Sequence, residues 1–293
     1  MPLFGEHESI GGGVHRSLYR AEKKGFDVIQ IFTRHRLKWS ARELSPDEIA
    51  RFKKAGQETG VMPVSIHGSY LLNPASPLKS ARLKTVDLLV NEVRWASELD
   101  IPFLVIHPGS HMGEGEERGM GYVSESLKEV FKRTSHLKVD ILLETTAGQG
   151  TSLGYRFSHL KTIMDNSDFS DRIGICFDTC HVFAAGYDFS VKEGYRQTIE
   201  NFDNVIGLDK LKIFHVNDSK TRSGSRVDRH IHPGQGFIGP DGLAYFLRDK
   251  KFAGHPFILE TSKEKDPDGI EMDIKNLEFL KRLSGMEMTD DSI

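Results

Sequence analysis

The sequence predicts an α/β fold, specifically a (β/α)8 TIM barrel. Six short apolar segments each stop at a histidine or an acidic residue; they end at His67, His107, Glu144, Asp178, His215 and Glu260. Each segment has the length and the β-branched or aromatic content of a buried strand, and turn-forming residues follow it directly. Helical segments alternate with these strands. Parallel strands in a barrel deliver their last side chains to one end, where the functional residues of this fold lie.

Five strands are expected in the first half of the chain, at residues 3–6, 26–32, 64–67, 104–107 and 141–144. Between the second and third strands, Ser45 can cap a helix, Pro46 fits its first turn and Glu48 completes a capping box. A long amphipathic helix follows the third strand and ends before Pro102. A further helix is expected from about Ser124.

Three more strands are expected in the second half, at residues 175–178, 211–215 and 257–260, separated by helices near 157–164, 195–205, 242–248 and 274–283. The total of eight strands is that of a closed barrel. A doubly wound sheet is the competing fold, but it would not bring six strand ends to one point. We therefore expect a single catalytic domain over residues 1–284 and a frayed polar tail over residues 285–293.

Size and composition fit a soluble globular protein. The 293 residues exceed the roughly 250 that such a barrel needs, and 28% of them are charged. No apolar stretch approaches a membrane span, and no secretory signal is visible, so we expect a cytoplasmic protein with no membrane partner. The two cysteines exclude a disulfide scaffold. The formal charge of −3 argues against nucleic acid, but three bound divalent cations would reverse its sign.

Histidine and carboxylate together suit zinc, manganese or iron(II) better than magnesium or calcium. His181 follows Asp178 by three residues, and Asp228-Arg229-His230 places two ligands on one side of an extended segment. His181, Asp228 and His230 thus offer a third set of three ligands, which leaves open positions for water and substrate. Cys180 is another possible ligand, although a small buried residue is the favoured interpretation.

A single histidine at a strand end is usually a satisfied core or turn residue, but six such endings favour a metal site at the C-terminal ends of the strands. Seven other histidines occupy no common position in the predicted elements, and most of them are interpreted as surface residues. They are His7, His15, His35, His111, His136, His159 and His255.

Three motifs resemble those of the endonuclease IV family, the zinc-dependent apurinic/apyrimidinic endonucleases of base excision repair. They are HGSYLLN at residues 67–73, CFDTCH at 176–181, and HVNDSK at 215–220 with DRH at 228–230. The early segment Gly5-x-His7-x-Ser9 and the pair Gly12-Gly13 also fit. The match runs in order from the first strand to Glu260.

The resemblance implies three zinc ions, with Mn²⁺ or Fe²⁺ possible at some sites. The implied ligands are Glu144, Asp178, His215 and Glu260 for one zinc, His67 and His107 with Glu144 bridging for the second, and His181, Asp228 and His230 for the third. The implied substrate is double-stranded DNA with an abasic site, cut 5′ to the lesion to leave a 3′-hydroxyl.

The implied enzyme is a zinc-dependent phosphodiesterase. Two metals joined by Glu144 would hold a bridging water and lower its pKa to about 7, and the resulting hydroxide would attack phosphorus. The third metal would meet the leaving 3′-oxygen. Glu144 and Glu260 are the expected catalytic residues, Glu260 by orienting the hydroxide as well as by ligation.

DNA contacts are also expected at the barrel mouth. By resemblance, Tyr70 and Leu71 enter the DNA at the lesion, where a missing base lowers the cost of flipping the nucleotide out. The alternative is that Leu71 and Leu72 pack under their loop. Basic residues on the loops can contact phosphates; they are Arg34, Arg36, Lys38, Lys220, Arg222, Arg226 and Arg229. The family usually has a basic residue two positions before Trp39, and here Leu37 departs from it.

Two rival functions remain open. A metal-dependent sugar isomerase or epimerase on the same barrel would fit the quartet of Glu144, Asp178, His215 and Glu260 equally well, but it would not need the other ligands. A non-catalytic lesion-binding protein would tolerate the loss of ligands, whereas all nine are present. We expect a monomer, associated with the nucleoid if the source is prokaryotic.

Overall fold

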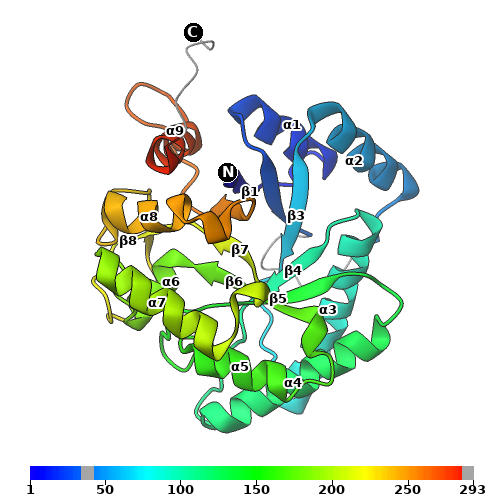
Figure 1. Cartoon of the computed structure of the whole chain (residues 1–293). Helices are drawn as coiled ribbons and strands as arrows, with labels where there is room; N and C mark the ends of the chain where they lie inside the picture. The colour runs from blue at the N-terminus through cyan, green and yellow to red at the C-terminus, as the bar shows by residue number, and fades with distance from the viewer. Residues whose placement is uncertain (34–42, 286–293) are drawn as a thin grey trace.

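The computed structural model describes residues 1–33 and 43–285. Eight parallel strands close into a barrel in the order β1-β10-β7-β6-β5-β4-β3-β2, with the helices around it (Figure 1). The barrel strands are β1 (Leu3–Glu8), β2 (Val28–Phe32), β3 (Met62–His67), β4 (Phe103–Ile106), β5 (Asp140–Glu144), β6 (Ile173–Asp178), β7 (Leu211–His215) and β10 (Pro256–Leu259). The predicted (β/α)8 barrel is confirmed, and its closure excludes a doubly wound sheet.

The helices fill the segments between the strands. They are α1 (His15–Lys24), α2 (Pro46–Thr59), α3 (Lys79–Glu98), α4 (Glu116–Arg133), α5 (Phe157–Asp165), α6 (Thr179–Ala185), α7 (Lys192–Val205), α8 (Gly239–Arg248) and α9 (Met272–Ser284). None of these described helices has the length and apolar character needed to cross a membrane. At α2 the predicted capping box is confirmed, because Ser45 Oγ accepts from Glu48 N and the Glu48 carboxylate accepts from Ser45 N.

One local expectation was wrong. Helix α4 begins at Glu116 rather than near Ser124, because Glu116 and Glu117 in its first turn favour a helix N-terminus. Gly119 weakens the helical pattern but is needed there, since a Cβ would lie 2.7 Å from the Cβ of His111. Asp228 and Arg229 lie in an irregular segment, and His230 begins β9 (His230–Ile231), which forms a short antiparallel pair with β8 (Asp218–Ser219) that was not predicted.

Some of the predicted residues lie outside the described part of the chain. These are Arg34, His35, Arg36, Leu37, Lys38 and Trp39, together with residues 286–293 of the polar tail.

The interior of the barrel is built in layers that position the polar end. One buried layer is apolar and consists of Val28, Val64, Val105, Leu142, Cys176, Ile213 and Ile258. Side chains alternate along a strand, so the next inward position lies two residues further on. On six strands that position holds Gln30, His107, Glu144, Asp178, His215 and Glu260. A register irregularity between β2 and β3 pairs Gln30 with Ser65 and Phe32 with His67.

Candidate metal centre

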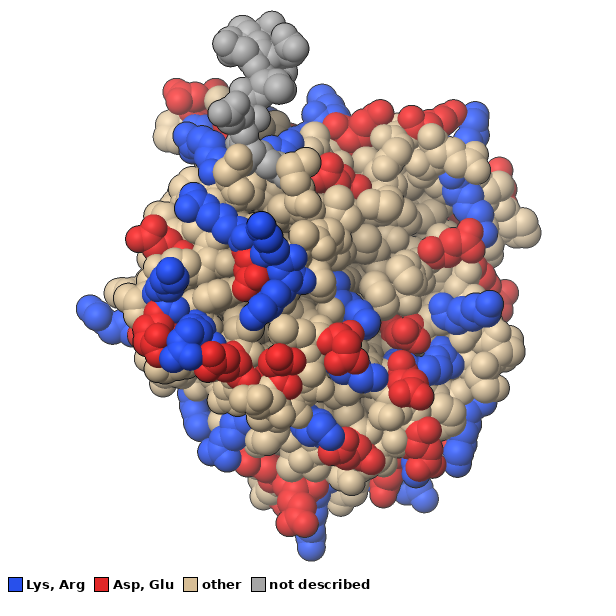
Figure 2. All heavy atoms as spheres, viewed as in Figure 1, with Lys and Arg blue, Asp and Glu red and all other residues tan. Residues whose placement is uncertain are grey.

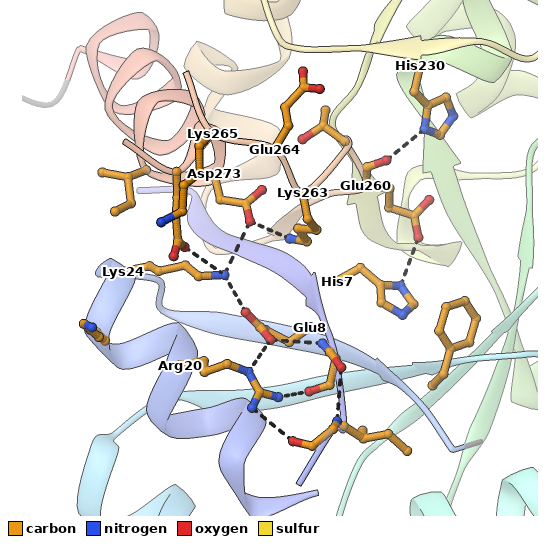
Figure 3. Close-up of a pocket in the computed structure, with 18 of the residues that line it drawn as sticks. His7, Glu8, Arg20, Lys24, His230, Glu260, Lys263, Glu264, Lys265 and Asp273 are labelled. Atoms are coloured by element: carbon orange, nitrogen blue, oxygen red, sulfur yellow. Dashed lines mark hydrogen bonds and ion pairs between the residues drawn. The ribbon is translucent and has the colours of Figure 1, made fainter. Parts of the chain in front are cut away.

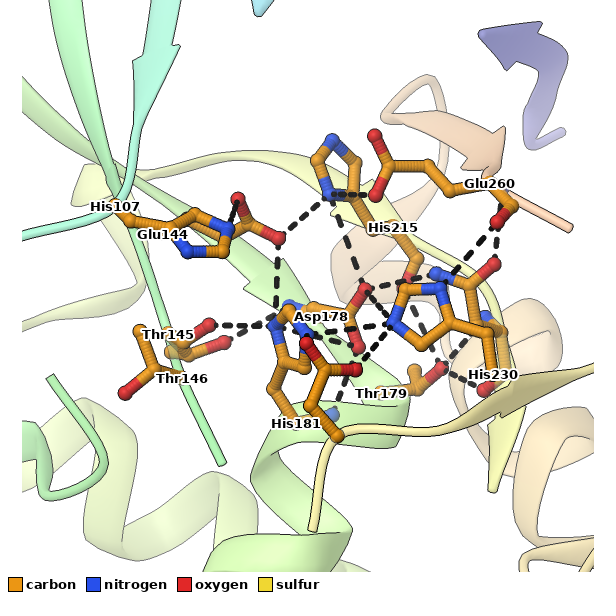
Figure 4. A network of polar contacts seen from close by, with 12 residues as sticks. His107, Glu144, Thr145, Thr146, Asp178, Thr179, His181, His215, His230 and Glu260 are labelled. Carbon is orange, nitrogen blue, oxygen red and sulfur yellow. Dashed lines mark hydrogen bonds and ion pairs between the residues drawn. The ribbon is translucent and has the colours of Figure 1, made fainter. Parts of the chain in front are cut away.

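The nine predicted ligands come together at the C-terminal end of the barrel. Figure 4 shows His107, Glu144, Asp178, His181, His215, His230 and Glu260 pointing toward one another. The donor atoms at this end form overlapping groups in which all atoms lie within 4.8 Å of one another: His67, Glu144, His215 and Glu260; His107, Glu144 and His181; Asp178, His181 and His230; and Cys180, Asp228 and His230. This grouping differs from the implied one, since His67 lies with His215, and Asp178 with His181. That all nine bind metal stays a prediction.

Glu144 occupies the middle of the cluster. Its Oε2 lies 3.0 Å from His67 Nε2 and 2.8 Å from His107 Nε2, and its Oε1 lies 2.9 Å from His215 Nδ1. Burial alone would raise the pKa of Glu144, but the rings of His107 and His215 hold that pKa well below its usual value. A carboxylate whose two oxygens face different imidazoles has the geometry of a bridging ligand.

Three of the histidines are oriented by backbone carbonyl groups. A carbonyl can only accept, so His67 Nδ1 donates to Gly68 O at 2.8 Å and His181 Nδ1 donates to Thr145 O at 2.9 Å. His230 Nδ1 donates in the same way to Glu260 O at 3.3 Å. In each ring the Nε2 lone pair is then directed into the site, as metal ligation requires.

The arrangement of His181, Asp228 and His230 shows that a cation would fit between these three side chains. The Nε2 atoms of His181 and His230 lie 3.3 Å apart, and Asp228 approaches them at 3.2 and 3.3 Å. Burial would lower the pKa of His181, yet Asp178 and Asp228 raise it well above the usual value. Two facing lone pairs beside carboxylates attract a positive charge, so this donor set fits a divalent metal ion.

Two residues next to the ligands hold the surrounding segments together. Asn217 Nδ2 donates to Asp178 Oδ2 at 2.8 Å, and its Oδ1 accepts from Glu260 N at 2.9 Å. The Asp218 carboxylate accepts from five backbone N–H groups, those of Ser219, Gly234, Gly236, Ile238 and Gly239. Asp218 thereby fixes the segment that follows His230. Our sequence reasoning assigned no role to either residue, although both follow the end of β7.

The interpretation of the remaining histidines as mostly surface residues was wrong for two of them. His159 is buried beside Tyr155. Strand β1 extends past the predicted end, so His7 turns inward, with its Nδ1 3.4 Å from Glu260 Oε1. Both residues could have been found by counting two positions along the strand from a residue that faces the barrel interior: His7 from Gly5, and Gln30 from Val28. By contrast, Cys180 is a free, buried thiol, and burial raises its pKa to about 12, which supports its interpretation as a small core residue.

A cavity of about 1050 Å³ adjoins the metal centre and is lined near it by His7, Phe32, Tyr70, His230 and Glu260 (Figure 3). Farther from the centre, its wall is formed by ion pairs between buried carboxylates and two lysines, of which Lys263 is 43% exposed. Lys24 Nζ lies 2.9 Å from Glu6 and 2.6 Å from Glu8, and Lys263 Nζ lies 2.6 Å from Glu6 and 2.8 Å from Asp273. We call Glu6, Glu8, Lys24, Lys263 and Asp273 the ion-pair cluster.

The residues predicted to contact DNA differ in exposure. Tyr70 is 60% exposed, whereas Leu71 is half-buried and Leu72 packs against the core. The basic side chains of Lys220, Arg222, Arg226 and Arg229 are exposed or half-buried. Lys and Arg gather left of the centre of the face in Figure 2 and mix with acidic residues around its rim. Arg36 lies outside the described residues.

Comparison with known proteins identifies the relatives of this chain. The family model of the xylose isomerase-like TIM barrel matches residues 18–283. A probable endonuclease 4 of Chloroflexus aurantiacus is 45% identical over 283 residues, which cover 97% of this chain and 98% of the relative. A probable endonuclease 4 of Geotalea daltonii is 45% identical and covers 94% of this chain and 96% of its own.

Two solved structures share the fold of this chain. Endonuclease IV from Thermus thermophilus superimposes with a TM-score of 0.84 and 32% identity, covering 98% of this chain and 100% of that one. A D-tagatose 3-epimerase-like protein shares the fold at a TM-score of 0.74 with 22% identity, covering 97% of both chains.

Proposed function

The chain belongs to the endonuclease IV family, within the xylose isomerase-like TIM barrels, and from that premise we propose that it is a DNA repair endonuclease. It hydrolyses the phosphodiester 5′ to an abasic site in double-stranded DNA and leaves a 3′-hydroxyl. The observation that carries the proposal is the meeting of all nine donor side chains at one end of the barrel. A sugar epimerase on this fold would not need His67, His107 and the pair of Asp228 and His230.

Three zinc ions are the proposed cofactors, with Mn²⁺ or Fe²⁺ able to replace some of them. Bound zinc would lower the pKa of a water toward neutrality and offset the negative charge that develops on the phosphate oxygens and the leaving oxygen. Glu144 would bridge two ions, because its oxygens face His67 and His107 on one side and His215 on the other. His181, Asp228 and His230 would hold the third.

The chain itself supplies orientation and charge balance. Glu260 is held through Oε1 by Gln30 at 2.7 Å while its Oε2 lies 3.2 Å from His215 Nδ1, so this carboxylate would bind a metal together with His215 and would help to orient the water. His67, His181 and His215 are buried, which keeps bulk water away from the reacting atoms. Glu144 and Glu260 are therefore the proposed catalytic residues, through ligation and orientation.

Contact with DNA would involve Tyr70 and the basic loops. Tyr70 is exposed at the mouth, with its ring 5.9 Å from Phe32 and 6.3 Å from His67, so it can fill the space of a missing base. Leu71 would assist it. Lys220 and Arg229 are exposed near the third ligand set and would bind phosphates, and Arg36 completes the proposed contacts. We propose a cytoplasmic monomer whose catalytic domain spans residues 1–284.

The direct test is incision of a duplex that carries one abasic analogue. We expect a single nick on its 5′ side with a 3′-hydroxyl product, and loss of the nick after treatment with a chelator. Glu144→Gln should reduce the rate by about 10³-fold or more, because a bridging ligand acts through several kcal/mol of transition-state charge stabilisation. The control Glu125→Gln changes an exposed residue of α4 and should retain the wild-type rate.

Incision by Glu144→Gln at the wild-type rate would contradict the bridging role. A panel of ketose substrates belongs in the same assay. Epimerisation without nicking would replace the nuclease by the sugar enzyme, and tight binding of the abasic duplex without nicking would replace it by a lesion-binding protein.

A further inference from the structure

Gln30 lies in the same inward layer as the predicted ligands but is not one of them. It comes from β2, is fully buried, and its amide touches three polar partners around the metal centre as well as Ser65. Gln30 Nε2 donates to Glu260 Oε1 at 2.7 Å and faces His7 Nδ1 at 3.1 Å. Gln30 Oε1 lies 2.8 Å from Ser65 Oγ and 3.1 Å from His215 Nε2.

The chemistry of these partners fixes the direction of each hydrogen bond. The Glu260 carboxylate can only accept, so the amide nitrogen of Gln30 must face it. The amide oxygen must then face Ser65 and His215, and Ser65 Oγ donates to it. His215 therefore donates from Nε2, and its Nδ1 carries the lone pair. That Nδ1 atom lies 2.9 Å from Glu144 Oε1 and 3.2 Å from Glu260 Oε2, on the metal side of the ring.

His215 differs in this respect from the other oriented histidines. His67, His181 and His230 give their outer N–H to a backbone carbonyl and present Nε2 to the site. His215 presents Nδ1 instead, and its outer N–H goes to a side chain. The tautomer of this one ring therefore depends on a residue that a mutation can remove.

We propose that Gln30 is a positioning residue of the metal centre, which holds His215 as the Nε2–H tautomer and aims Glu260 Oε2 at the same ion. The inference rests on the proposed binding of metal at this site. Ser65 sets the amide in the required orientation. Because one amide orients two ligands, its loss would weaken the hold on the ion that these ligands share more than the hold on the others.

The test compares metal binding by variants that keep the nine ligands. Gln30→Met fills a similar volume without hydrogen bonds and should lower the affinity for one zinc per chain, the ion that His215 and Glu260 share, by about 10- to 100-fold, the usual effect of removing the partner of a metal-bound histidine. Ser65→Ala removes one donor to the amide and should have a smaller effect in the same direction. Gln57→Met replaces a glutamine on α2, far from the barrel interior, and should bind zinc as the wild type does.

Two measurements test the proposed role of Gln30. Competition with a chromophoric chelator gives the affinity and the number of zinc ions per chain, and ¹⁵N spectra of labelled histidine report the tautomer of His215. The expected result is a proton on His215 Nε2 and none on Nδ1 in the zinc-bound wild-type protein, and weakened zinc binding in Gln30→Met. A proton on Nδ1, or unchanged zinc affinity in a folded Gln30→Met protein, would overturn the proposal.

The two proposals fail in different ways. If the wild-type protein binds no zinc, the proposed function itself is lost. If the wild type binds zinc and cuts DNA while Gln30→Met does both equally well, only the role of Gln30 is lost. The spectra of the wild type and the binding of Ser65→Ala decide the matter even if Gln30→Met does not fold.

Discussion

The barrel carries two groups of buried charges at the same end, and they are balanced in different ways. In the ion-pair cluster, each carboxylate meets a lysine within 2.9 Å, and Lys24 and Lys263 share their partners. In the metal centre, no lysine or arginine of the described residues forms an ion pair with Glu144, Asp178, Asp228 or Glu260; their partners are imidazoles and amides. The first group finds its partners within the chain, and the second would be completed by the proposed cations.

Removal of metal should have the largest effect that separates the two groups. Metal that binds only the folded state stabilises it by about 4 kcal/mol when its free concentration is about 1,000 times its Kd. Dialysis against a chelator should therefore lower Tm by many degrees, and zinc should restore it. The measurement is thermal unfolding with and without chelator. An unchanged Tm would mean that the buried acids and imidazoles are self-sufficient, as the ion-pair cluster is.

Substitution in the ion-pair cluster should have the opposite signature. Lys24→Met leaves Glu6 and Glu8 without their shared partner and should destabilise the fold by about 3 kcal/mol, as is usual when one member of a buried pair is removed. The number of bound zinc ions should not change. The matched control Lys23→Met alters the exposed neighbour in α1 and should stay within about 0.5 kcal/mol of the wild type. Loss of zinc from Lys24→Met would show that the two groups are coupled.

Changes of pH should give the smallest but most specific effect. In the metal-free protein the pKa values of His181 and His215 lie well above normal despite burial, because Asp178 acts on His181 and Cys176 and Glu260 act on His215. The protonated rings of His181 and His215 stabilise the fold fully at pH values below the unfolded pKa of about 6.5. This contribution is lost as the pH rises through the pKa values that the two rings have in the folded protein. Chelated protein should thus become more stable as the pH falls from about 8 toward about 6.5.

Within the ion-pair cluster, burial raises the pKa of Glu6 to about 8, so Glu6 adds to the loss of stability at alkaline pH, whereas Glu8 responds in a lower range. Burial would raise the pKa of Glu8, but Lys24 and its other neighbours lower it to about 2. Its stabilising effect is present above about 4.5 and is lost as the pH falls toward about 2. Urea unfolding of the chelated protein at pH values from about 2 to about 8 measures the loss of stability on both the acid and the alkaline side. A metal-free protein that is most stable at the alkaline end would contradict the assignment of the histidines.

The strand-end pattern was sufficient to predict the barrel and the meeting of six side chains, and the spacings of His181 after Asp178 and of Asp228 and His230 added the other three. Apolar runs that stop at His107 or Glu144 identify both the strand and the end to which its last side chain belongs. The way the ligands divide into groups was not predictable, because it depends on the rotation of each side chain and on the register irregularity beside Ser65. The short β8–β9 pair was missed, since strands of two residues carry no periodic signal.

The supporting residues escaped prediction for a different reason. Gln30 and Asn217 are neither metal ligands nor titratable groups, so no role was assigned to them, although Asn217 lies within the HVNDSK motif at residues 215–220. Their importance follows from position: Gln30 stands two residues after an inward Val28, and Asn217 two residues after His215. His7 was passed over because the first strand was expected to end at Glu6, two residues before its observed end at Glu8.

The use of main-chain carbonyls to orient three of the histidines bears on how the protein tolerates sequence drift. Every amino acid provides a carbonyl, so this role constrains the backbone path and not the side chain of Gly68 or Thr145. Each of these positions is limited for another reason: a Cβ on Gly68 would lie 2.9 Å from Leu72 Cδ1, and Thr145 Oγ1 accepts from Asp178 N. In a saturation library selected for growth under DNA damage, serine should therefore be tolerated at Thr145 and only alanine at Gly68. Almost no substitution should be tolerated at Gln30.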